Sequence, residues 1–288
     1  MRLALALIAR GQDAWVVNAD SAQVYADLRV LSARPSAEEM RGIRHELFGT
    51  WDGAQACSAA DWATEAKRVI ADAHQAGAVP VLVGGTGLYI RTLLDGIAPV
   101  PEIEPDVRAA VRALPLDTAY AELQLCDPKR AAKLSPADSQ RITRALEVAR
   151  STGRTLGEWQ EKREGGIANA ISLAPLVLLP DREAIYSRCD SRFAKMMERG
   201  AIEEVEALLE RQLLPDLPVM RAIGVPEITT YLRGESSRDE VIERAQQATR
   251  NYAKRQYTWL RHQPPSEWAR NAPENVNLEV NFAILFPD

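Results

Sequence analysis

The sequence predicts an α/β fold, in which a parallel sheet packs with helices and a helical insert interrupts the chain. Apolar runs indicate strands over 15–18 and 79–83, and the second run is apolar throughout, as in a strand buried on both faces. Asp20 follows the first strand, and the glycine-rich turn 84–87 follows the second. Because open α/β sheets bind ligands at the carboxyl ends of their strands, we expect a site there.

The first two helices have recognisable ends. Residues 2–10 are helix-like, and Gly11 stands where a C-terminal cap is expected. Residues 58–76 predict a second helix, because Ser58 is a suitable N-cap and apolar residues recur behind it at helical spacing.

The glycine-rich turn leads into a helix predicted over 88–94 and has two interpretations. Backbone amides at a helix N-terminus form a natural anion site. Such a turn is equally often a tight connection without a ligand. Three prolines between Pro99 and Pro105 then mark a domain boundary.

The rest of the chain is predominantly helical. Residues 106–163 have a helical pattern throughout, the apolar run 173–179 indicates a return to the sheet, and 183–262 is mostly helical. We therefore expect an α/β core with C-terminal helices over 1–100 and 172–288, and a helical insertion domain over 101–171.

The composition is that of an ordinary soluble protein, with 46% hydrophobic and 26% charged residues among 288. A net charge of −5 argues against a uniformly basic nucleic-acid binder but is compatible with local basic patches. The three cysteines are far apart and include no CxxC, so neither a zinc site nor a disulfide framework is supported. The N-terminal apolar stretch is too short to span a membrane. We expect a cytoplasmic protein, and a monomer because nothing in the sequence demands a dimer.

Asp20 has two interpretations. It is either a turn or N-cap aspartate, which a strand exit often needs, or a carboxylate that accepts a substrate proton or holds a metal ion. Gln23, three residues further on, carries an amide that could read the edge of a base.

Three groups of basic residues are candidates for phosphate contacts. Arg141 and Arg144 lie one turn apart on a predicted helix, where they form either a solvated face or a grip on phosphates. Arg250 and Lys254 belong to the segment 244–262, which has five Lys or Arg residues and no acidic one, a patch suited to a nucleic acid or a pyrophosphate. Arg221 ends a turn bounded by prolines, where a plain surface arginine is the usual case. A neighbouring stripe is interpreted as core: Tyr252, Gln256 and Trp259.

Taken together, five motifs resemble the tRNA dimethylallyltransferase (tRNA isopentenyltransferase) family. Each motif is weak alone, but they stand in the family's order over residues 2 to about 262, which makes the resemblance specific. The motifs are Asp20–Tyr25, Val83–Tyr89, Asp138–Val148, Arg221–Gly224 and Thr249–Gln256.

The resemblance implies a P-loop-kinase-like core with an inserted helical domain. It implies transfer of a dimethylallyl group from dimethylallyl diphosphate to N6 of the adenosine 3′ of the anticodon in tRNA, with Mg²⁺ as cofactor and the base flipped into a channel. By this resemblance Asp20 is the general base and a candidate metal ligand, Thr86 lines the channel, and Arg221 stabilises the leaving diphosphate. The residues it implies for contact with the tRNA anticodon stem-loop are Asp20, Ser21, Ala22, Gln23, Gln140, Arg141, Ile142, Thr143, Arg144, Arg250 and Lys254.

The sequence departs from the family pattern at its start. The family's first strand and its loop ending in Gly-Lys-Ser/Thr, which cradles the diphosphate, do not occur in it. In P-loop folds that strand lies between the strands expected over 15–18 and 79–83, so its absence predicts two rows of unpaired backbone groups. We expect upstream in-frame codons to encode the strand and loop, and without the loop the activity of the 288-residue chain is in question.

Two other functions stay open. One is a non-catalytic tRNA-binding protein that has lost the phosphate loop, and the other is an adenylate isopentenyltransferase that acts on free adenine nucleotides. The helical insert and the paired Arg141 and Arg144 favour a macromolecular acceptor.

Overall fold

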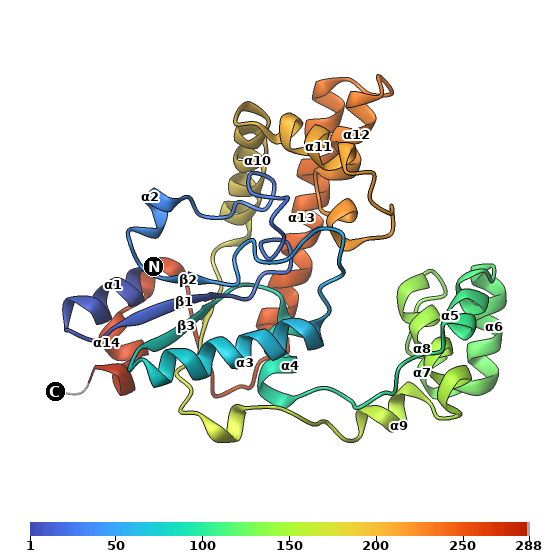
Figure 1. Cartoon of the computed structure of the whole chain (residues 1–288), viewed down its shortest axis with the longest axis horizontal. Coiled ribbons are helices and arrows are strands. Elements are labelled where there is room, and N and C mark those ends of the chain that lie inside the picture. The colour runs from blue at the N-terminus through green and yellow to red at the C-terminus, as the bar shows by residue number, and fades with distance from the viewer. Residues whose placement is uncertain (287–288) are drawn as a thin grey trace. The chain divides into compact units, whose positions relative to one another are not determined.

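Three parallel strands form the main sheet, in the spatial order β2-β1-β3 (Figure 1). They are β1 (Ala14–Asn18), β2 (His45–Glu46) and β3 (Val79–Val83), in a computed structural model that describes residues 1–286. Both strands predicted from apolar runs are present. The two-residue β2 was not predicted, because so short a strand carries no periodicity of its own.

Strands β1 and β3 pair directly with each other. Their register runs from Ala14 opposite Val79 to Asn18 opposite Val83, and the Ala19 N–H donates to the Val83 carbonyl at 2.8 Å just beyond the ladder. The expectation of unpaired backbone rows between these two strands is therefore wrong. Each strand supplies the hydrogen-bond partners that the other needs.

Helices α1 (Arg2–Ala9) and α3 (Ala59–Gln75) pack on the sheet. In α1, the buried Leu7 joins a cluster with Ala14 and Val16, which are alternate residues of β1 and so point to one face. The sequence of α3 starts with a capping box, in which the Ser58 and Asp61 side chains each accept from the other's backbone N–H.

Trp62 fixes α3 against the strand. Its side chain is fully buried, and the indole N–H donates to the carbonyl oxygen of Asn18 at 2.9 Å. Its ring stacks on Tyr89 of α4 (Gly87–Asp95), with 4.6 Å between centroids. One aromatic side chain of α3 thus contacts both β1 and α4, the helix that follows β3.

A group of helices completes the C-terminal part of the core, and in it α13 packs along α10 and α12. Glu204 of α11 also holds the loop after β1, because its carboxylate accepts from the backbone N–H groups of Arg29, Val30 and Leu31 at 2.6–2.9 Å. The segments are α10 (Arg182–Glu198), α11 (Ala201–Glu210), the 3₁₀ turn η2 (Pro218–Arg221), α12 (Val225–Leu232) and α13 (Arg238–His262).

The sequence predicted that the apolar run over 173–179 returns to the main sheet. This prediction is wrong. Strand β4 (Leu176–Leu178) of this run pairs in parallel with β5 (Ala269–Asn271) in a separate two-stranded sheet. An apolar pattern indicates a strand but not the partner of that strand. The remaining short elements outside the helical insertion are α2 (Ala37–Met40), η3 (Pro273–Asn275), α14 (Leu278–Asn281) and η4 (Ala283–Leu285).

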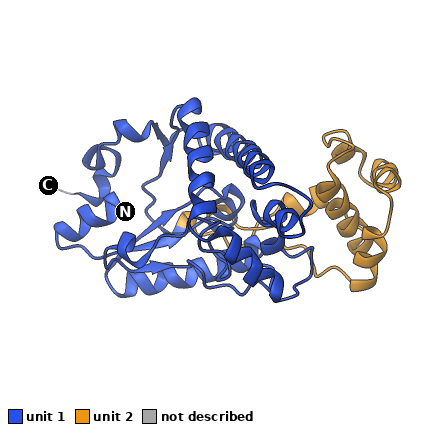
Figure 2. Cartoon of the chain, turned by 90° about the horizontal axis from the view of Figure 1, so that it is seen from above, with its two compact units in different colours: residues 1–93, 170–288 blue, residues 94–169 orange. Residues whose placement is uncertain are grey.

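The chain divides into two compact units (Figure 2). The first contains residues 1–93 and 170–288, and the second contains residues 94–169. The sequence predicted the helical insertion over 101–171, so both expected boundaries lie a few residues C-terminal to the observed ones.

The second unit is helical and has its own apolar core, which includes the fully buried Leu123, Ile142 and Leu146. The helical pattern predicted over 106–163 corresponds to several short helices separated by turns. They are α5 (Pro105–Arg112), α6 (Leu116–Cys126), α7 (Pro128–Ala131), α8 (Ser139–Thr152), α9 (Leu156–Gln160) and η1 (Ala168–Ala170).

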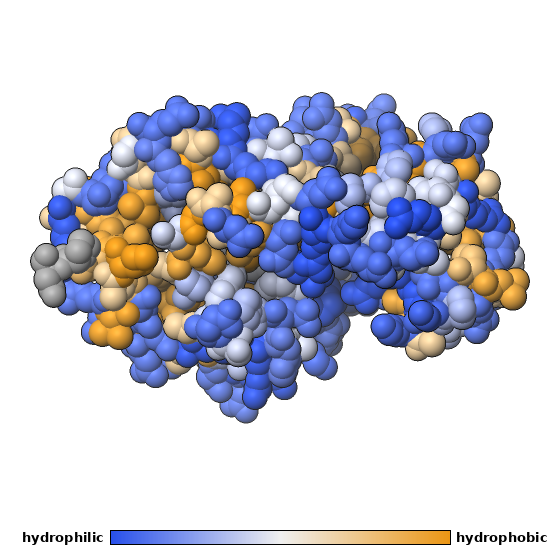
Figure 3. Space-filling model, turned by 90° about the horizontal axis from the view of Figure 1, so that it is seen from below, coloured by the Kyte–Doolittle hydropathy of each residue, from blue (hydrophilic) through white to orange (hydrophobic). Residues whose placement is uncertain are grey.

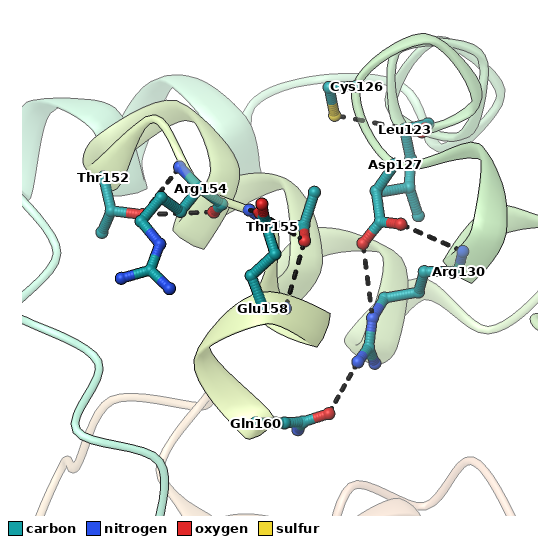
Figure 4. A network of polar contacts seen from close by, with 9 residues as sticks. All are labelled: Leu123, Cys126, Asp127, Arg130, Thr152, Arg154, Thr155, Glu158 and Gln160. Carbon is teal, nitrogen blue, oxygen red and sulfur yellow. Dashed lines mark hydrogen bonds and ion pairs between the residues drawn. The ribbon is translucent and has the colours of Figure 1, made fainter. Parts of the chain in front are cut away.

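Polar side chains hold the turns of this unit (Figure 4). Asp127 caps α7 by accepting from the backbone N–H of Arg130 at 3.1 Å, and the Arg130 guanidinium donates to Gln160 Oε1 at 2.7 Å. Thr155 and Glu158 form a capping box at the start of α9. These contacts tie α7 to α9 and explain why short helices persist here.

The view in Figure 3 shows a largely hydrophilic face with local apolar areas. In residues 1–286, no helix is both long enough and apolar enough to cross a membrane. The large apolar side chains that are most exposed are Leu125, Leu214, Val280 and Ile284.

We predict that Trp62→Phe lowers the free energy of unfolding by about 1–3 kcal/mol, because it leaves the buried Asn18 carbonyl without its indole donor. Urea unfolding followed by circular dichroism measures the loss. Trp51→Phe is the matched control, since no hydrogen bond involves the Trp51 indole among the described residues. Equal effects of the two variants would contradict the prediction.

Candidate active site

The buried side chain of Asn18 shapes the exit of β1. Its Nδ2 donates to the carbonyl oxygens of Asp20 and Leu47, both at 3.0 Å, and its Oδ1 accepts from the Asp20 N–H at 2.9 Å. Asp20 Oδ1 in turn accepts from the Ala22 N–H at 2.8 Å. This arrangement fixes the Asp20 carboxylate as part of an Asx-type turn. The second carboxylate oxygen has no hydrogen-bond partner among the described residues.

Thr86 joins the exits of the two neighbouring strands. Its backbone N–H donates to the Ala19 carbonyl at 3.1 Å, and its Oγ1 accepts from the Ser21 N–H at 2.9 Å. Its hydroxyl also lies 3.3 Å from Ser21 Oγ. Thr86 therefore positions the loop that carries Asp20.

The glycines of the turn after β3 permit close contacts. A Cβ at Gly84 would lie 2.3 Å from the carbonyl carbon and oxygen of Ala19, and one at Gly87 would lie 2.3 Å from the Trp259 ring. The tight-connection interpretation explains both glycines. The anion-site interpretation is not needed for them, because Trp259 packs against the N-terminal residue of α4.

A cavity of about 750 Å³ opens beside these strand exits, entirely within the first unit. Segments far apart in the sequence surround it: the loop after β1, helices α10 and α13, and the turn η2. Of the predicted catalytic and base-reading residues, those that line it are Asp20, Ser21, Ala22, Gln23 and Arg221.

Gln23 is held by the loop that follows it. Its Nε2 donates to the carbonyl oxygens of Ser32 and Ala33 at 3.0 and 3.1 Å. The amide nitrogen is therefore occupied, and the Oε1 atom remains as a hydrogen-bond acceptor for a ligand.

Tyr252 and Gln256 line the same cavity, although their stripe on α13 was interpreted as core. The Tyr252 hydroxyl lies within hydrogen-bonding reach of Ser21, Thr86 and Gln256. Burial raises the pKa of this phenol, and the negative charge of Asp20 raises it further. Tyr252 thus stays neutral. The sequence did contain a signal that this stripe is not plain core. Gln256 lies one turn from Tyr252, and a buried amide needs polar partners.

Tyr89 and Cys57 form another neutral part of the wall. The Tyr89 hydroxyl lies 3.4 Å from the Cys57 carbonyl oxygen, and the Cys57 N–H donates to the Tyr25 hydroxyl at 3.1 Å. Burial raises the pKa of Tyr89 and of the Cys57 thiol. Sequence reasoning assigned no role to these side chains: Tyr25 and Tyr89 each end one of the family motifs, and Cys57 lies outside all of them.

The predicted basic patch on α13 is partly neutralised. Arg250 forms an ion pair with Asp190 of α10, with 2.6 Å between Nη1 and Oδ1. Lys254 is exposed on the same helix. The sequence identified the cations of one helix but could not show the carboxylate that a neighbouring helix brings to one of them.

The other predicted RNA contacts lie on α8 in the second unit. Arg141 pairs with Asp138 at 3.0 Å and Arg144 with Glu147 at 3.6 Å, although both guanidiniums remain partly accessible to solvent. Gln140 is exposed and Thr143 is half-buried. Ile142 has no exposed surface and is a core residue, so its side chain is not presented to a ligand.

The described residues contain no group of three or more His, Cys, Asp and Glu side chains that could hold a metal ion. Asp20 is the single acidic residue that lines the cavity, and one of its oxygens already binds the Ala22 N–H. This set cannot form an all-protein Mg²⁺ site. It does fit an ion that keeps several waters and takes its other ligands from substrate phosphates.

A carboxylate at a strand exit, in a cavity that an arginine also lines, is typical of an α/β enzyme that handles phosphorylated substrates. The pattern of the IPP transferase family matches residues 23–263, and this chain belongs to that family. The predicted family is therefore confirmed.

Two curated relatives are similar over nearly their whole length. The tRNA dimethylallyltransferase of Novosphingobium aromaticivorans is 71% identical over 276 residues, which cover 96% of this chain and 98% of the relative. That of Erythrobacter litoralis is 62% identical over 99% of this chain and 90% of the relative.

Solved structures agree with the fold. The tRNA isopentenylpyrophosphate transferase of Bacillus halodurans superposes with a TM-score of 0.66 at 28% identity, covering 98% of this chain and 90% of that one. A eukaryotic dimethylallyltransferase, described as acting on tRNA, gives a TM-score of 0.72 at 28% identity over 90% of this chain and 66% of that one. The predicted α/β, P-loop-kinase-like fold with a helical insertion is confirmed.

We predict that Gly84→Ala destabilises the protein by about 1–3 kcal/mol, because the added methyl group collides with the Ala19 backbone and separates the two strand exits. Gly157→Ala is the control, since the nearest atom to its added Cβ lies 3.7 Å away. Urea unfolding of both variants tests this, and an unchanged midpoint for Gly84→Ala would refute it.

Proposed function

We propose that this protein transfers a dimethylallyl group from dimethylallyl diphosphate to N6 of the adenosine 3′ of the anticodon in tRNA. The observation that carries the proposal is the fixed Asp20 carboxylate, which keeps one unpartnered oxygen and lines a cavity that Arg221 also lines. Membership of the IPP transferase family supports this reaction. We also propose that the protein acts in the cytoplasm, where its tRNA acceptor is found, and that it acts as a monomer.

The chemistry needs a base and an anion site on either side of the reacting atoms. The N6 lone pair forms a bond to the allylic C1, the C1–O bond breaks, and the diphosphate leaves with that electron pair. N6 then carries an extra proton, which the free oxygen of Asp20 accepts. Arg221 stabilises the negative charge that develops on the leaving diphosphate.

Positioning of the adenine is assigned to the loop that contains Gln23 and to Thr86. The exocyclic amine of adenine is a hydrogen-bond donor, and Gln23 Oε1 is the acceptor that its held amide leaves available. Thr86 keeps the Ser21 backbone in place beside the base. The Tyr252 hydroxyl, in reach of Ser21 and Thr86, supports the same loop from α13.

The second unit is proposed to hold the RNA outside the cavity. Gln140, Arg141, Thr143 and Arg144 lie on one helix, and the two guanidiniums keep accessible surface despite their ion pairs. Arg and polar side chains of this kind contact phosphates without reading sequence. With Lys254 on α13, they give binding a strong dependence on salt.

Mg²⁺ is the proposed cofactor and would be held mainly by phosphate oxygens of the donor and by water. Asp20 is the one candidate protein ligand in the cavity lining, and it would bind the ion through the oxygen that does not accept the amine proton. When bound, the ion neutralises part of the charge on the diphosphate.

We predict that Asp20→Asn lowers kcat for prenyl transfer about 10²–10⁴-fold, because the amide cannot accept the amine proton. The KM for RNA should change little, since the turn hydrogen bond to the Ala22 N–H can persist through the amide oxygen. Incorporation of labelled dimethylallyl groups into RNA measures the rate. Activity within a factor of about two of wild type would eliminate Asp20 as the base.

The acceptor is tested by offering the enzyme a tRNA anticodon stem-loop and, separately, AMP. We expect prenylation of the RNA and not of AMP. Transfer to AMP would indicate an adenylate isopentenyltransferase. Salt-sensitive RNA binding without transfer to either acceptor would indicate a non-catalytic tRNA-binding protein.

A further inference from the structure

One carboxylate of α11 holds three consecutive backbone N–H groups of the loop that follows β1. Glu204 Oε1 accepts from the N–H groups of Arg29 and Val30 at 2.6 and 2.8 Å, and its Oε2 accepts from the N–H of Leu31 at 2.9 Å. Successive N–H groups that point to one place form a concave anion site. Here the anion is a side chain of the protein itself, so Glu204 closes this site and fixes the backbone over 29–31.

The same backbone continues into a tight turn. The N–H of Ala33 donates to the Val30 carbonyl, and the N–H of Arg34 donates to the Arg29 carbonyl, both at 3.0 Å. Ala33 has a φ of 53°, a left-handed conformation that a residue with a Cβ adopts only when its surroundings enforce it. The turn therefore depends on contacts from outside, and Glu204 supplies three of them to its first residues.

The far end of this turn holds Gln23, which lines the cavity. Gln23 Nε2 donates to the carbonyl oxygens of Ser32 and Ala33, at 3.0 and 3.1 Å. Only the nitrogen of a carboxamide donates, so two carbonyls on one side fix which way the amide faces. The Oε1 atom is left as the group that a ligand meets. An amide rotated by half a turn would offer a donor instead, and its oxygen would oppose two carbonyl oxygens.

We propose that Glu204 is a positioning residue for base selection, which acts through this turn to make Gln23 present an acceptor. The inference rests on the proposed function, in which Gln23 reads the adenine amine. Adenine carries a donor amine at the position where a 6-oxopurine such as hypoxanthine carries an acceptor oxygen. With the turn held, Gln23 Oε1 matches the amine and opposes the carbonyl. With the turn loose, the amide is free to face either way and the preference falls.

A second contact keeps the loop on α11 when Glu204 is changed. The guanidinium of Arg211, at the C-terminal cap of α11, forms ion pairs with Asp27 and Asp52. The other oxygen of Asp27 accepts from the Gly53 N–H at 2.8 Å. Substitution of Glu204 is therefore expected to loosen the turn without detaching the loop that contains it.

The test compares binding of two anticodon stem-loop RNAs that differ only in adenosine or inosine at the acceptor position. The ratio of their dissociation constants cancels the phosphate contacts that both RNAs make. We expect wild type to favour adenosine, and Glu204→Gln to lower the ratio about threefold to tenfold, the effect of losing one oriented hydrogen bond. A glutamine has a single acceptor oxygen for the three N–H groups, so it cannot close the site. Glu204→Asp keeps the charge on a shorter side chain and should give a ratio between these two.

A double variant separates positioning from a general loss of structure. Gln23→Ala removes the reading group, and Glu204→Gln should not lower the ratio further in that background. The matched control is Glu206→Gln, which changes an exposed carboxylate of the same helix that makes none of the three bonds and should keep the wild-type ratio. Urea unfolding shows which variants are folded in the binding measurement. If Glu204→Gln does not fold, Glu204→Asp takes its place in every comparison.

Additive effects in the double variant would overturn the proposal, because Glu204 would then act independently of Gln23. Equal losses for Glu204→Gln and Glu206→Gln would also overturn it, as would a wild type that binds the two RNAs equally well. Prenyl transfer to the adenosine stem-loop is measured separately with wild type. If the ratios follow the expected pattern but no transfer occurs, the positioning role stands and the proposed reaction fails.

Discussion

The buried side chain of Asn18 is the constraint on which the rest of this structure depends. A primary amide can make several hydrogen bonds, and at the exit of β1 this one meets the backbone of Asp20 on one side and Leu47 on the other. Trp62 binds the Asn18 carbonyl from α3. The strand, the helix and the turn that contains Asp20 are therefore parts of one network, and loss of any bond would leave a buried polar group unsatisfied.

The cavity is built against this fixed turn by segments from the other end of the chain. Thr86 and Ser21 join the two strand exits, and Tyr252 of α13 approaches their hydroxyls. Burial keeps Tyr252 and Tyr89 neutral by raising the pKa of each phenol. The charges that remain in the wall are the Asp20 carboxylate and the guanidiniums, which is the separation of base and anion site that the proposed transfer requires.

Much of the site was predictable because it follows from local patterns. Asp20, Thr86 and Arg221 lie in short motifs, and the positions of β1, β3 and α3 follow from apolar runs and a capping serine. The partners of these elements were not predictable. Direct pairing of β1 with β3, the separate sheet of β4 and β5, and the burial of Ile142 are decided by segments distant in sequence.

The sequence by itself determined the family, the α/β class, the helical insertion and the carboxylate at the strand exit. The tertiary structure alone decided which charges are free. Arg250 and Arg221, which lines the cavity, look alike in a sequence, but Asp190 reaches only Arg250. The physical reason is that an electrostatic interaction depends on distance and burial, and both arise only when α10, η2 and α13 pack around the same space.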